Sequence, residues 1–472
     1  MIKFGTGGWR AVIGDDFNRD NVRRVAQALS DYAGENSLTS FPVVVGHDRR
    51  FLSEDSAKWF SEVLCANGLK VIYISRSAPT PLVMYTVQAG GYDFGVEITA
   101  SHNPPSYNGI KIIVKEGRDA PVGCTKRLEE LAEKAEPVSI PFDECLEKGL
   151  VSIPKTPFNG FLDSIISKLD MEVIREAGLR ILFDSMHGSG TFPLMTVLCT
   201  ARCTLDLMNS NKDAWFGGNN PAPGYAQLRM LRGRVEDEKY DLGIAVDGDG
   251  DRVGIVDPSG EYLSANSILS MLYWYLHEYR GWRGPVVRNV ATTHMLDKIA
   301  ASFGEKCYEV PVGFKYISEK MDEVDALLGG ESSGGLTVRG HINGKDSIYA
   351  ASLFVEMLAA THKTPKQIMD LLTEKYGSHV MVEDNFGFSP EDKQRIENLL
   401  MTERKLPAFS GKIPENANYS DGCKVTFLDG SFVICRFSGT EPLLRIFAEA
   451  GTEEKARELV DEMKEFCSAG SV

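Results

Sequence analysis

The sequence lacks the basic excess and the long apolar runs that define several large protein classes. Its formal net charge is −15 at pH 7, whereas nucleic acids and anionic membranes attract proteins with basic surfaces. We therefore expect neither as a partner. No stretch reaches membrane-spanning length, and the first residues, MIKFGTGGWRAVIGDD, contain no apolar run typical of a signal peptide. The sequence predicts a cytoplasmic protein.

Paired cysteines and a nucleotide-binding loop are also missing. The nine cysteines form no CxxC pair and only one CxxxC spacing, at Cys199 and Cys203. Disulfide and zinc frameworks use regularly spaced pairs, so scattered thiols in a reducing compartment are expected instead. The segment GHINGKD does not complete a Walker A motif, because Asp346 stands where Ser or Thr should follow the lysine.

An internal pattern, in which an apolar run breaks into a Gly- or Ser-rich loop, occurs three times. It occupies GYDFGVEITASHNPP (91–105), KYDLGIAVDGDGDR (239–252) and EVDALLGGESSGG (323–335). Another apolar run precedes each copy, at 41–50, 179–190 and 284–293, and helix-length segments such as 54–67 and 266–279 lie between. Strands that alternate with helices predict α/β units, whose ligands gather at the carboxyl ends of strands.

The chain is too long for one hydrophobic core, and its tail differs from the rest. From about Tyr376 it contains two alternating runs around an Asp429–Gly430 turn, the run LLRIFAEA, and a helix from Glu453 to about Phe466. The Pro137–Pro157 stretch indicates a linker, and Pro258 indicates a second break. We predict three α/β units and a smaller α+β domain, divided as 1–152, 153–257, 258–376 and 377–472.

The segment DGDGDR has carboxylates at alternating positions, Asp247, Asp249 and Asp251, with glycines between them. Glycine lets the backbone curl until alternate side chains converge, and oxygen ligands suit a hard cation such as Mg²⁺. An EF-hand is excluded, because positions six and twelve are Arg252 and Pro258. The alternative is an acidic surface turn.

Two further loops carry polar groups suited to sugar phosphates. RFSGTEP offers the Arg436 guanidinium, the Ser438 and Thr440 hydroxyls and the Gly439 N–H, which together could bind a phosphate, although a polar hairpin loop has the same composition. GGESSG pairs Glu331 with Ser333, which could bind vicinal sugar hydroxyls or form only a flexible turn. FGTGGWR ends in Arg10, which could also reach a phosphate.

TASHNP follows the first of the three patterned runs. Ser101 is a candidate nucleophile, His102 could orient it or donate a proton, and Lys111 is a possible base or phosphate ligand. Adjacent residues seldom share one proton, so a Ser101–His102 dyad is not expected, and no G-x-S-x-G elbow is present. A structural turn made by the Asn and the two prolines is the alternative.

Taken in order, FGTGGWR, TASHNP, NGIK, DGDGDR, VGFKYI, GGESSG and RFSGTEP resemble the α-D-phosphohexomutase superfamily, which contains phosphoglucomutases and phosphomannomutases. The resemblance spans nearly the whole chain and implies mixed sheets with an active-site cleft at the junction of the domains. It implies that Ser101 carries a phosphoryl group and that Arg10 and Arg252 flank that group. It also implies that Mg²⁺ is held by phosphorylated Ser101 together with Asp247, Asp249 and Asp251. It also gives Lys111 the role of general base and makes Lys315, Glu331, Ser333, Arg436, Ser438, Gly439 and Thr440 substrate ligands.

The resemblance further implies a reaction that passes through a hexose 1,6-bisphosphate, with glucose 1,6-bisphosphate as activator. Gly335 stands where many mannose-handling relatives have His, and His341 comes only later, so a glucose preference is expected. The phosphoglucosamine branch commonly has Ala in place of Gly250. Phosphomannomutase as the main activity, a metal-assisted phosphomonoesterase, and a non-catalytic sugar-phosphate-binding paralogue are the alternatives. A monomer or homodimer is expected, and His187 and Trp9 are assigned to packing or turns.

Overall fold

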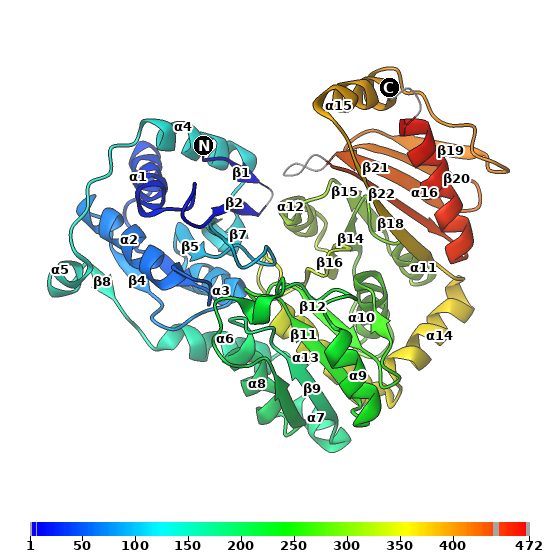
Figure 1. Cartoon of the computed structure of the whole chain (residues 1–472). Coiled ribbons are helices and arrows are strands. Elements are labelled where there is room, and N and C mark those ends of the chain that lie inside the picture. Colours follow the sequence, from blue (N-terminus) through cyan, green and yellow to red (C-terminus); the bar gives the residue numbers. More distant parts are fainter. Residues whose placement is uncertain (1, 6, 438–442, 469–472) are drawn as a thin grey trace.

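The computed structural model describes residues 2–5, 7–437 and 443–468. Its strands form four sheets, and each sheet with its helices makes one of four units along the chain (Figure 1). Three units are α/β with mixed sheets and the last is α+β, so the predicted fold class is confirmed. None of the helices in the described part of the chain has the length and apolar content to cross a membrane.

The first unit has a sheet in the order β1-β2-β6-β5-β3-β4-β8, with β7 paired to β6. Its strands are β1 (Phe4–Gly5), β2 (Gly8–Val12), β3 (Val43–His47), β4 (Val71–Tyr73), β5 (Phe94–Ile98), β6 (Tyr107–Val114), β7 (Arg118–Asp119) and β8 (Val151–Ser152). Its helices are α1 (Arg19–Glu35), α2 (Ser53–Ala66), α3 (Thr80–Gly90), α4 (Val122–Lys134) and α5 (Phe142–Glu147). The Pro137–Pro157 stretch is thus not a bare linker, because it contains α5 and β8, and β8 pairs with β4.

The second unit has the order β10-β9-β11-β12-β13. Its elements are α6 (Thr156–Ile166), α7 (Met171–Ala177), β9 (Arg180–Asp184), α8 (Thr191–Thr200), β10 (Thr204–Met208), α9 (Arg229–Asp237), β11 (Leu242–Val246), β12 (Val253–Val256) and β13 (Tyr262–Leu263). Pro258 lies in the turn between β12 and β13, which pair with each other, so the second sheet continues past this proline.

The third unit has the order β15-β14-β16-β17. Its elements are α10 (Ala265–Glu278), β14 (Val286–Asn289), α11 (Met295–Ser302), β15 (Cys307–Val310), α12 (Phe314–Val324), β16 (Leu328–Gly330), β17 (Leu336–Val338), α13 (Ser347–Thr361) and α14 (Pro365–Tyr376). Helices α10 and α13 are apolar on nearly every side and lie in one core shared with the second unit, where Tyr273, Tyr349 and Phe354 are fully buried.

The fourth unit is an antiparallel sheet in the order β18-β22-β21-β20-β19. Its elements are β18 (Val380–Gly387), α15 (Pro390–Glu397), β19 (Pro414–Asn418), β20 (Cys423–Phe427), β21 (Phe432–Phe437), β22 (Leu443–Ala450) and α16 (Glu453–Ser468). The predicted hairpin at Asp429–Gly430 and the predicted final helix are both confirmed. Figure 1 shows α16 lying across this sheet.

The repeated sequence pattern corresponds to one repeated arrangement. Strands β5, β11 and β16 each pair in parallel with an earlier strand of their unit, namely β3, β9 and β14. Each also pairs antiparallel with the strand that follows it, namely β6, β12 and β17. The three predicted site loops are therefore the short connections between these antiparallel neighbours, at the carboxyl ends of parallel strands.

Candidate active site

The loops after β5, β11 and β16 meet where the first three units join. Thr80 of the first unit donates from its N–H to the Asp249 carbonyl and from its hydroxyl, at 2.6 Å, to an Asp249 carboxylate oxygen. The third unit contacts the same loop, because the Val253 N–H donates to the Gly334 carbonyl at 3.3 Å. The predicted metal-binding loop therefore contacts both the start of α3 in the first unit and the sugar loop of the third.

Ser101 turns the chain sharply after β5. Its φ is +52°, in the left-handed region that non-glycine residues seldom adopt, and its side chain is fully buried. Backbone strain of this kind persists only where neighbours hold it and is common at functional sites. The turn directs the Ser101 hydroxyl to the second unit, where it donates to Asp247 Oδ2 at 3.1 Å.

His102 lies beside the hydroxyl of Ser101, where it can orient that hydroxyl as the sequence suggested, although a Ser101–His102 dyad was not expected. Ser101 Oγ and His102 Nδ1 are 3.3 Å apart. The positive charge of Arg252, burial and the positive charge of Arg10 hold the pKa of His102 well below its ordinary value. The imidazole is therefore neutral near pH 7 and, because the single proton of the Ser101 hydroxyl goes to Asp247, it can donate from Nδ1 to Ser101 Oγ.

Arg50 fixes the backbone of the serine loop. Its Nη1 donates to the carbonyls of Pro104 and Tyr107 at 2.9 Å, and its Nη2 donates to those of Ser101 and Asn103 at 2.6 and 2.7 Å. The guanidinium is itself held by Asp48, 3.3 Å from its Nε. Sequence reasoning missed Arg50, and the only signal was its place just after an apolar run.

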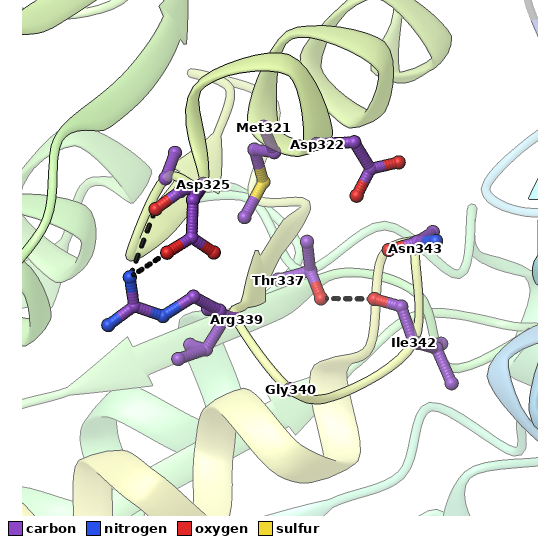
Figure 2. Close-up of a pocket in the computed structure, with 10 residues that line it drawn as sticks. Met321, Asp322, Asp325, Thr337, Arg339, Gly340, Ile342 and Asn343 are labelled. Carbon is purple, nitrogen blue, oxygen red and sulfur yellow. Dashed lines mark hydrogen bonds and ion pairs between the residues drawn. The ribbon is translucent and has the colours of Figure 1, made fainter.

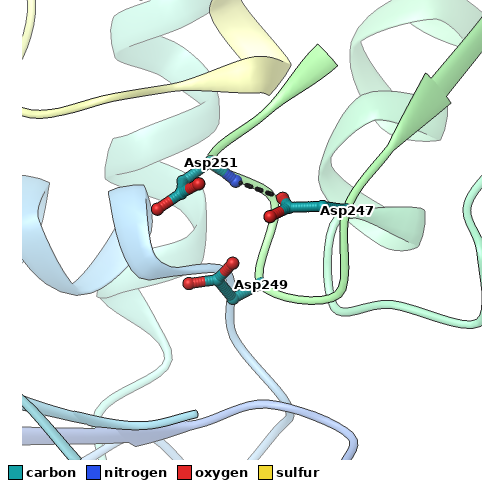
Figure 3. Close-up of side chains that lie close together, drawn as sticks. All are labelled: Asp247, Asp249 and Asp251. Carbon is teal, nitrogen blue, oxygen red and sulfur yellow. Dashed lines mark hydrogen bonds between the residues drawn. The ribbon is translucent and has the colours of Figure 1, made fainter. Parts of the chain in front are cut away.

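The three aspartates of DGDGDR converge as predicted. Each offers a carboxylate oxygen within 4.8 Å of the others, and all three side chains are buried (Figure 3). Gly250 has a φ of +69°, and Asp247 Oδ1 closes the turn by accepting from the N–H groups of Asp251 and Arg252 at 2.8 and 3.0 Å. Burial and the two neighbouring carboxylates raise the pKa of Asp247 well above its ordinary value.

This cluster has the ligand type and the unpaired carboxylate oxygens that a hard divalent cation requires. Oδ1 of Asp249 and Oδ1 of Asp251 are buried and accept no hydrogen bond. A buried carboxylate oxygen without a partner is costly, and a bound cation would satisfy both oxygens and relieve the repulsion that raises the pKa of Asp247. Three carboxylates without nitrogen or sulfur ligands suit Mg²⁺.

Two lysines from other units supply positive charge to the aspartates. Lys111 Nζ lies 2.6 Å from Asp249 and 2.8 Å from Asp251, and Lys345 Nζ lies 3.1 Å from Asp251. Burial alone would lower the pKa of Lys111, but the two carboxylates outweigh it and the net pKa is raised. Lys111 was predicted. Lys345 was not.

The two predicted arginines lie beside the serine loop and the aspartates. Arg10, on β2, donates from Nη1 to Asn103 Oδ1 at 2.7 Å. Arg252 ends the metal loop, and its Nε lies 3.8 Å from Asp251. Both arginines therefore supply positive charge close to Ser101.

The sugar loop holds its two predicted residues together. Ser333 Oγ donates to Glu331 Oε1 at 2.7 Å, and Asn289 Nδ2 lies 3.5 Å from Glu331 Oε2. Lys315, in the first turn of α12, lines a small hollow together with Lys111 and Asp119. These groups therefore come from two units and lie beside the metal loop.

Arg436 is apart from this group. Its Nε and Nη2 each donate at 3.0 Å to the carboxylate of Asp421 in the same unit. Among the described residues it contacts none of the other predicted site residues. Ser438, Gly439 and Thr440, the other predicted members of its loop, lie outside the described residues.

Four family models match consecutive parts of the chain. They are the phosphoglucomutase/phosphomannomutase alpha/beta/alpha domains I, II and III, at residues 1–139, 159–260 and 264–376, and the C-terminal domain at residues 394–466. The chain belongs to the phosphoglucomutase/phosphomannomutase family. The resemblance inferred from seven motifs is thereby confirmed.

Relatives of this family match the chain over almost its full length. A phosphoglucomutase/phosphomannomutase of Thermococcus kodakarensis is 28% identical, covering 97% of this chain and 96% of the relative. A protein of Methanopyrus kandleri, named as a probable phosphoglucosamine mutase, is 30% identical, covering 97% and 96%. The crystal structure of a protein from Thermus thermophilus, provisionally assigned as a phosphomannomutase, superposes with a TM-score of 0.86 at 28% identity and 99% coverage of both chains.

A separate hollow lies in the third unit of this phosphoglucomutase/phosphomannomutase family member. It has a volume of about 110 Å³ and lies between the end of α12 and the loop after β17 (Figure 2). Arg339 pairs there with Asp325 at 2.9 Å, and Thr337 donates to the Ile342 carbonyl at 2.7 Å. None of the predicted site residues lines it, so this hollow is separate from the candidate active site.

Proposed function

We propose that this chain is a Mg²⁺-dependent phosphohexomutase that interconverts glucose 1-phosphate and glucose 6-phosphate through a phosphoserine at Ser101. The observation that carries this proposal is the buried contact between the Ser101 hydroxyl and Asp247, at 3.1 Å, in a cluster of three carboxylates from another unit. Nucleophile and metal ligands on separate units are expected where a phosphoryl group is bound between them.

In the first half-reaction, the free hydroxyl of a hexose monophosphate attacks the phosphoryl group on Ser101. The new bond joins phosphorus to the sugar oxygen, the bond to Ser101 Oγ breaks, and the proton of the sugar hydroxyl ends on Ser101 Oγ, which gives a hexose 1,6-bisphosphate. In the second half, Ser101 Oγ attacks the other phosphoryl group of that bisphosphate, so the phosphoserine is restored and the isomeric monophosphate is released. A bound Mg²⁺ would neutralise charge on the transferring group.

The residues around Ser101 have separate roles in charge stabilisation, orientation and proton transfer. Arg10 and Arg252 stabilise the charge that the transferring phosphoryl group carries. Neutral His102 holds the Ser101 hydroxyl. Lys111 keeps its proton while it is paired with Asp249 and Asp251, so it can act as general base only after those two ion pairs are released.

The third and fourth units bind the rest of the substrate. Glu331 and Ser333 form hydrogen bonds with sugar hydroxyls, and Lys315 contacts the ligand. The phosphate that does not react is bound by Arg436, Ser438, Gly439 and Thr440. In this proposal the domains divide at residues 152 and 376 and, because β13 belongs to the second sheet, after Leu263 instead of at the predicted 257. Glucose 1,6-bisphosphate acts as activator, and the protein is a cytoplasmic monomer or homodimer.

The preference for glucose is supported by the surroundings of Gly335. A Cβ at this position would lie 2.1 Å from Lys345 Cδ, so the His of mannose-handling relatives would require a shift of the Lys345 side chain, which pairs with Asp251. Relatives named for mannose and glucosamine phosphates make phosphomannomutase and phosphoglucosamine mutase the competing activities. A phosphomonoesterase is disfavoured, since the described residues contain one candidate metal cluster and no second one beside it.

Product analysis tests this proposal. The protein is incubated with Mg²⁺, a trace of glucose 1,6-bisphosphate and, in parallel, glucose, mannose or glucosamine 1-phosphate. We expect fastest formation of the 6-phosphate from glucose 1-phosphate, no free phosphate, and loss of activity in Ser101→Ala. Release of inorganic phosphate would indicate a phosphatase. Faster turnover of mannose or glucosamine 1-phosphate would change the assigned substrate, and no turnover of any of the three sugar phosphates would favour the non-catalytic paralogue.

A further inference from the structure

The Arg436 guanidinium is held by a carboxylate that neither the motifs nor the proposed mechanism uses. Asp421, between β19 and β20, accepts from Nε at Oδ2 and from Nη2 at Oδ1, both at 3.0 Å. Such a two-point pair fixes the plane of the guanidinium as well as its position. It occupies two of the five N–H donors, and no hydrogen bond from the other three to another described side chain accompanies it.

Asp421 is itself fixed by the third unit and by its own chain. Its Oδ2 also accepts from the backbone N–H of Val312 at 2.7 Å. Val312 lies two residues before the start of α12, which carries Lys315 in its first turn. Gly422, with φ of +87°, brings the chain so close to β21 that a Cβ would lie 2.2 Å from the Cys435 carbonyl oxygen.

We propose that Asp421 is a positioning residue for the distal phosphate of the substrate. It holds Arg436 of the fourth unit in the orientation that binds the phosphate, and through Val312 it sets the distance from Arg436 to Lys315 of the third unit. This inference rests on the proposed function, because it takes Arg436 as the ligand of the non-reacting phosphate. Both half-reactions use that phosphate equally, so Asp421 affects binding of substrate more than the chemical step.

A different role for the same contact makes the opposite prediction. If the carboxylate only occupied the place of the phosphate, it would compete with substrate, and its removal would tighten binding. The bond to Val312 favours positioning, since a displaceable stand-in needs no second, independent anchor on another unit. The two roles therefore differ in the sign of the change in KM.

The experiment compares Asp421→Asn with wild type and with Asp384→Asn. Asn keeps an oxygen that can accept from Val312 but removes the charge that orients Arg436. Asp384, on β18 of the same unit, pairs with Lys464 at 2.8 Å and serves as the matched control. The measurements are KM and kcat for glucose 1-phosphate, the Kd of glucose 6-phosphate by calorimetry, and the Tm of each protein.

For Asp421→Asn we expect KM and Kd to rise about 10- to 100-fold, with kcat within about 3-fold of wild type, because a hydrogen bond to a charged group typically contributes on this scale. The Tm should stay within a few degrees, and Asp384→Asn should match wild type throughout. Unchanged or lower KM and Kd in Asp421→Asn would overturn the inference, as would a lowered kcat alone.

The inference and the proposed function can fail separately. Normal turnover by wild type with unchanged KM in Asp421→Asn would reject the positioning role and keep the mutase. If wild type binds glucose 6-phosphate without turning it over, and Asp421→Asn binds it more weakly, the mutase is rejected and the positioning role is kept. A wild-type protein that binds no hexose phosphate would reject both.

Discussion

At the scale of single residues, the arrangement at Ser101 depends on groups that make no contact with its hydroxyl. Its left-handed φ is maintained by Thr99, whose hydroxyl accepts from the Ser101 N–H at 2.8 Å, and by Arg50, which binds four carbonyls of the loop. A strained nucleophile requires such support, because otherwise the loop would relax and the hydroxyl would turn away from Asp247.

Arg50→Lys tests this support. An ammonium is a compact point charge and cannot reproduce two planar sets of donors, so we expect kcat/KM for the mutase reaction to fall about 10- to 100-fold while the protein stays folded. The neighbouring Arg49 also donates to backbone carbonyls, those of His187 and Ser210, and lies outside the serine loop. Arg49→Lys should therefore stay within about 3-fold of wild type, and an equal loss in both variants would contradict a specific role for Arg50.

The residues at the site divide into those that sequence could predict and those it could not. Ser101, Lys111 and the three aspartates lie in short motifs whose local chemistry is sufficient, and the aspartates converge through a local turn at Gly250. Arg50, Lys345 and Asp421 act through contacts between segments far apart in the chain, such as the 3.1 Å pair of Lys345 with Asp251. No periodicity or spacing encodes such contacts, because tertiary packing within and between the units decides them.

At the scale of elements, the connection from β17 to α13 anchors the metal loop. Asp346 caps α13 by accepting from the N–H groups of Ile348 and Tyr349, and its other carboxylate oxygen lies 2.6 Å from His341 Nε2. The next residue, Ser347, donates from its hydroxyl to the Gly250 carbonyl at 2.7 Å. The helix start is therefore fixed to the turn that brings the aspartates together.

Ser347→Ala should loosen that turn without altering a metal ligand. One hydrogen bond contributes about 0.5–1.5 kcal/mol, so we expect the Kd for Mg²⁺, measured by calorimetry, to rise about 2- to 10-fold. Ser352→Ala is the matched control, since its hydroxyl on the same helix bonds only to the Ile348 carbonyl. Equal affinity in wild type and Ser347→Ala would show that the contact contributes nothing to the metal site.

The repeat of strand and loop was predictable at this scale because all three copies share one apolar pattern, and β5, β11 and β16 lie within it. Short elements could not be predicted in this way. Strands β8 and β13 have two residues each, lie in or next to proline-bearing stretches, and form because a neighbouring strand pairs with them. Tertiary pairing outweighs local propensity in such cases.

At the scale of the whole molecule, the fourth unit docks on the third through an apolar patch beside a buried charge cluster. Val290 and Ala291 pack against Phe432, Ile434 and Phe447. Beside this patch Lys424 of β20 pairs with Glu309 of β15, which also binds Arg288 at 2.7 Å. An interface with its own core and a charge network should hold the unit that carries Arg436 in one orientation.

The buried lysine makes this docking dependent on pH. Burial and the charge of Arg288 lower the pKa of Lys424 from 10.5 to about 8, although Glu309 acts in the opposite direction. Below about pH 8 the lysine is protonated in the folded and unfolded states alike. Between about pH 8 and 10.5 only the unfolded state keeps the proton, so stability rises with pH over that window, by up to about 1.4 kcal/mol per unit.

Lys424→Met removes the titrating group and keeps most of its volume. The quantity of interest is the Tm of wild type minus the Tm of Lys424→Met. We expect this difference to be a few degrees larger at pH 9.5 than at pH 7.5, two values chosen on either side of about 8. Thermal unfolding followed by circular dichroism at several pH values measures this gap. Lys405→Met, at a lysine of the same unit that is 64% exposed, should follow wild type in parallel. A gap that stays constant across the range would mean that Lys424 keeps its proton in the folded state, held by Glu309 against the cost of burial.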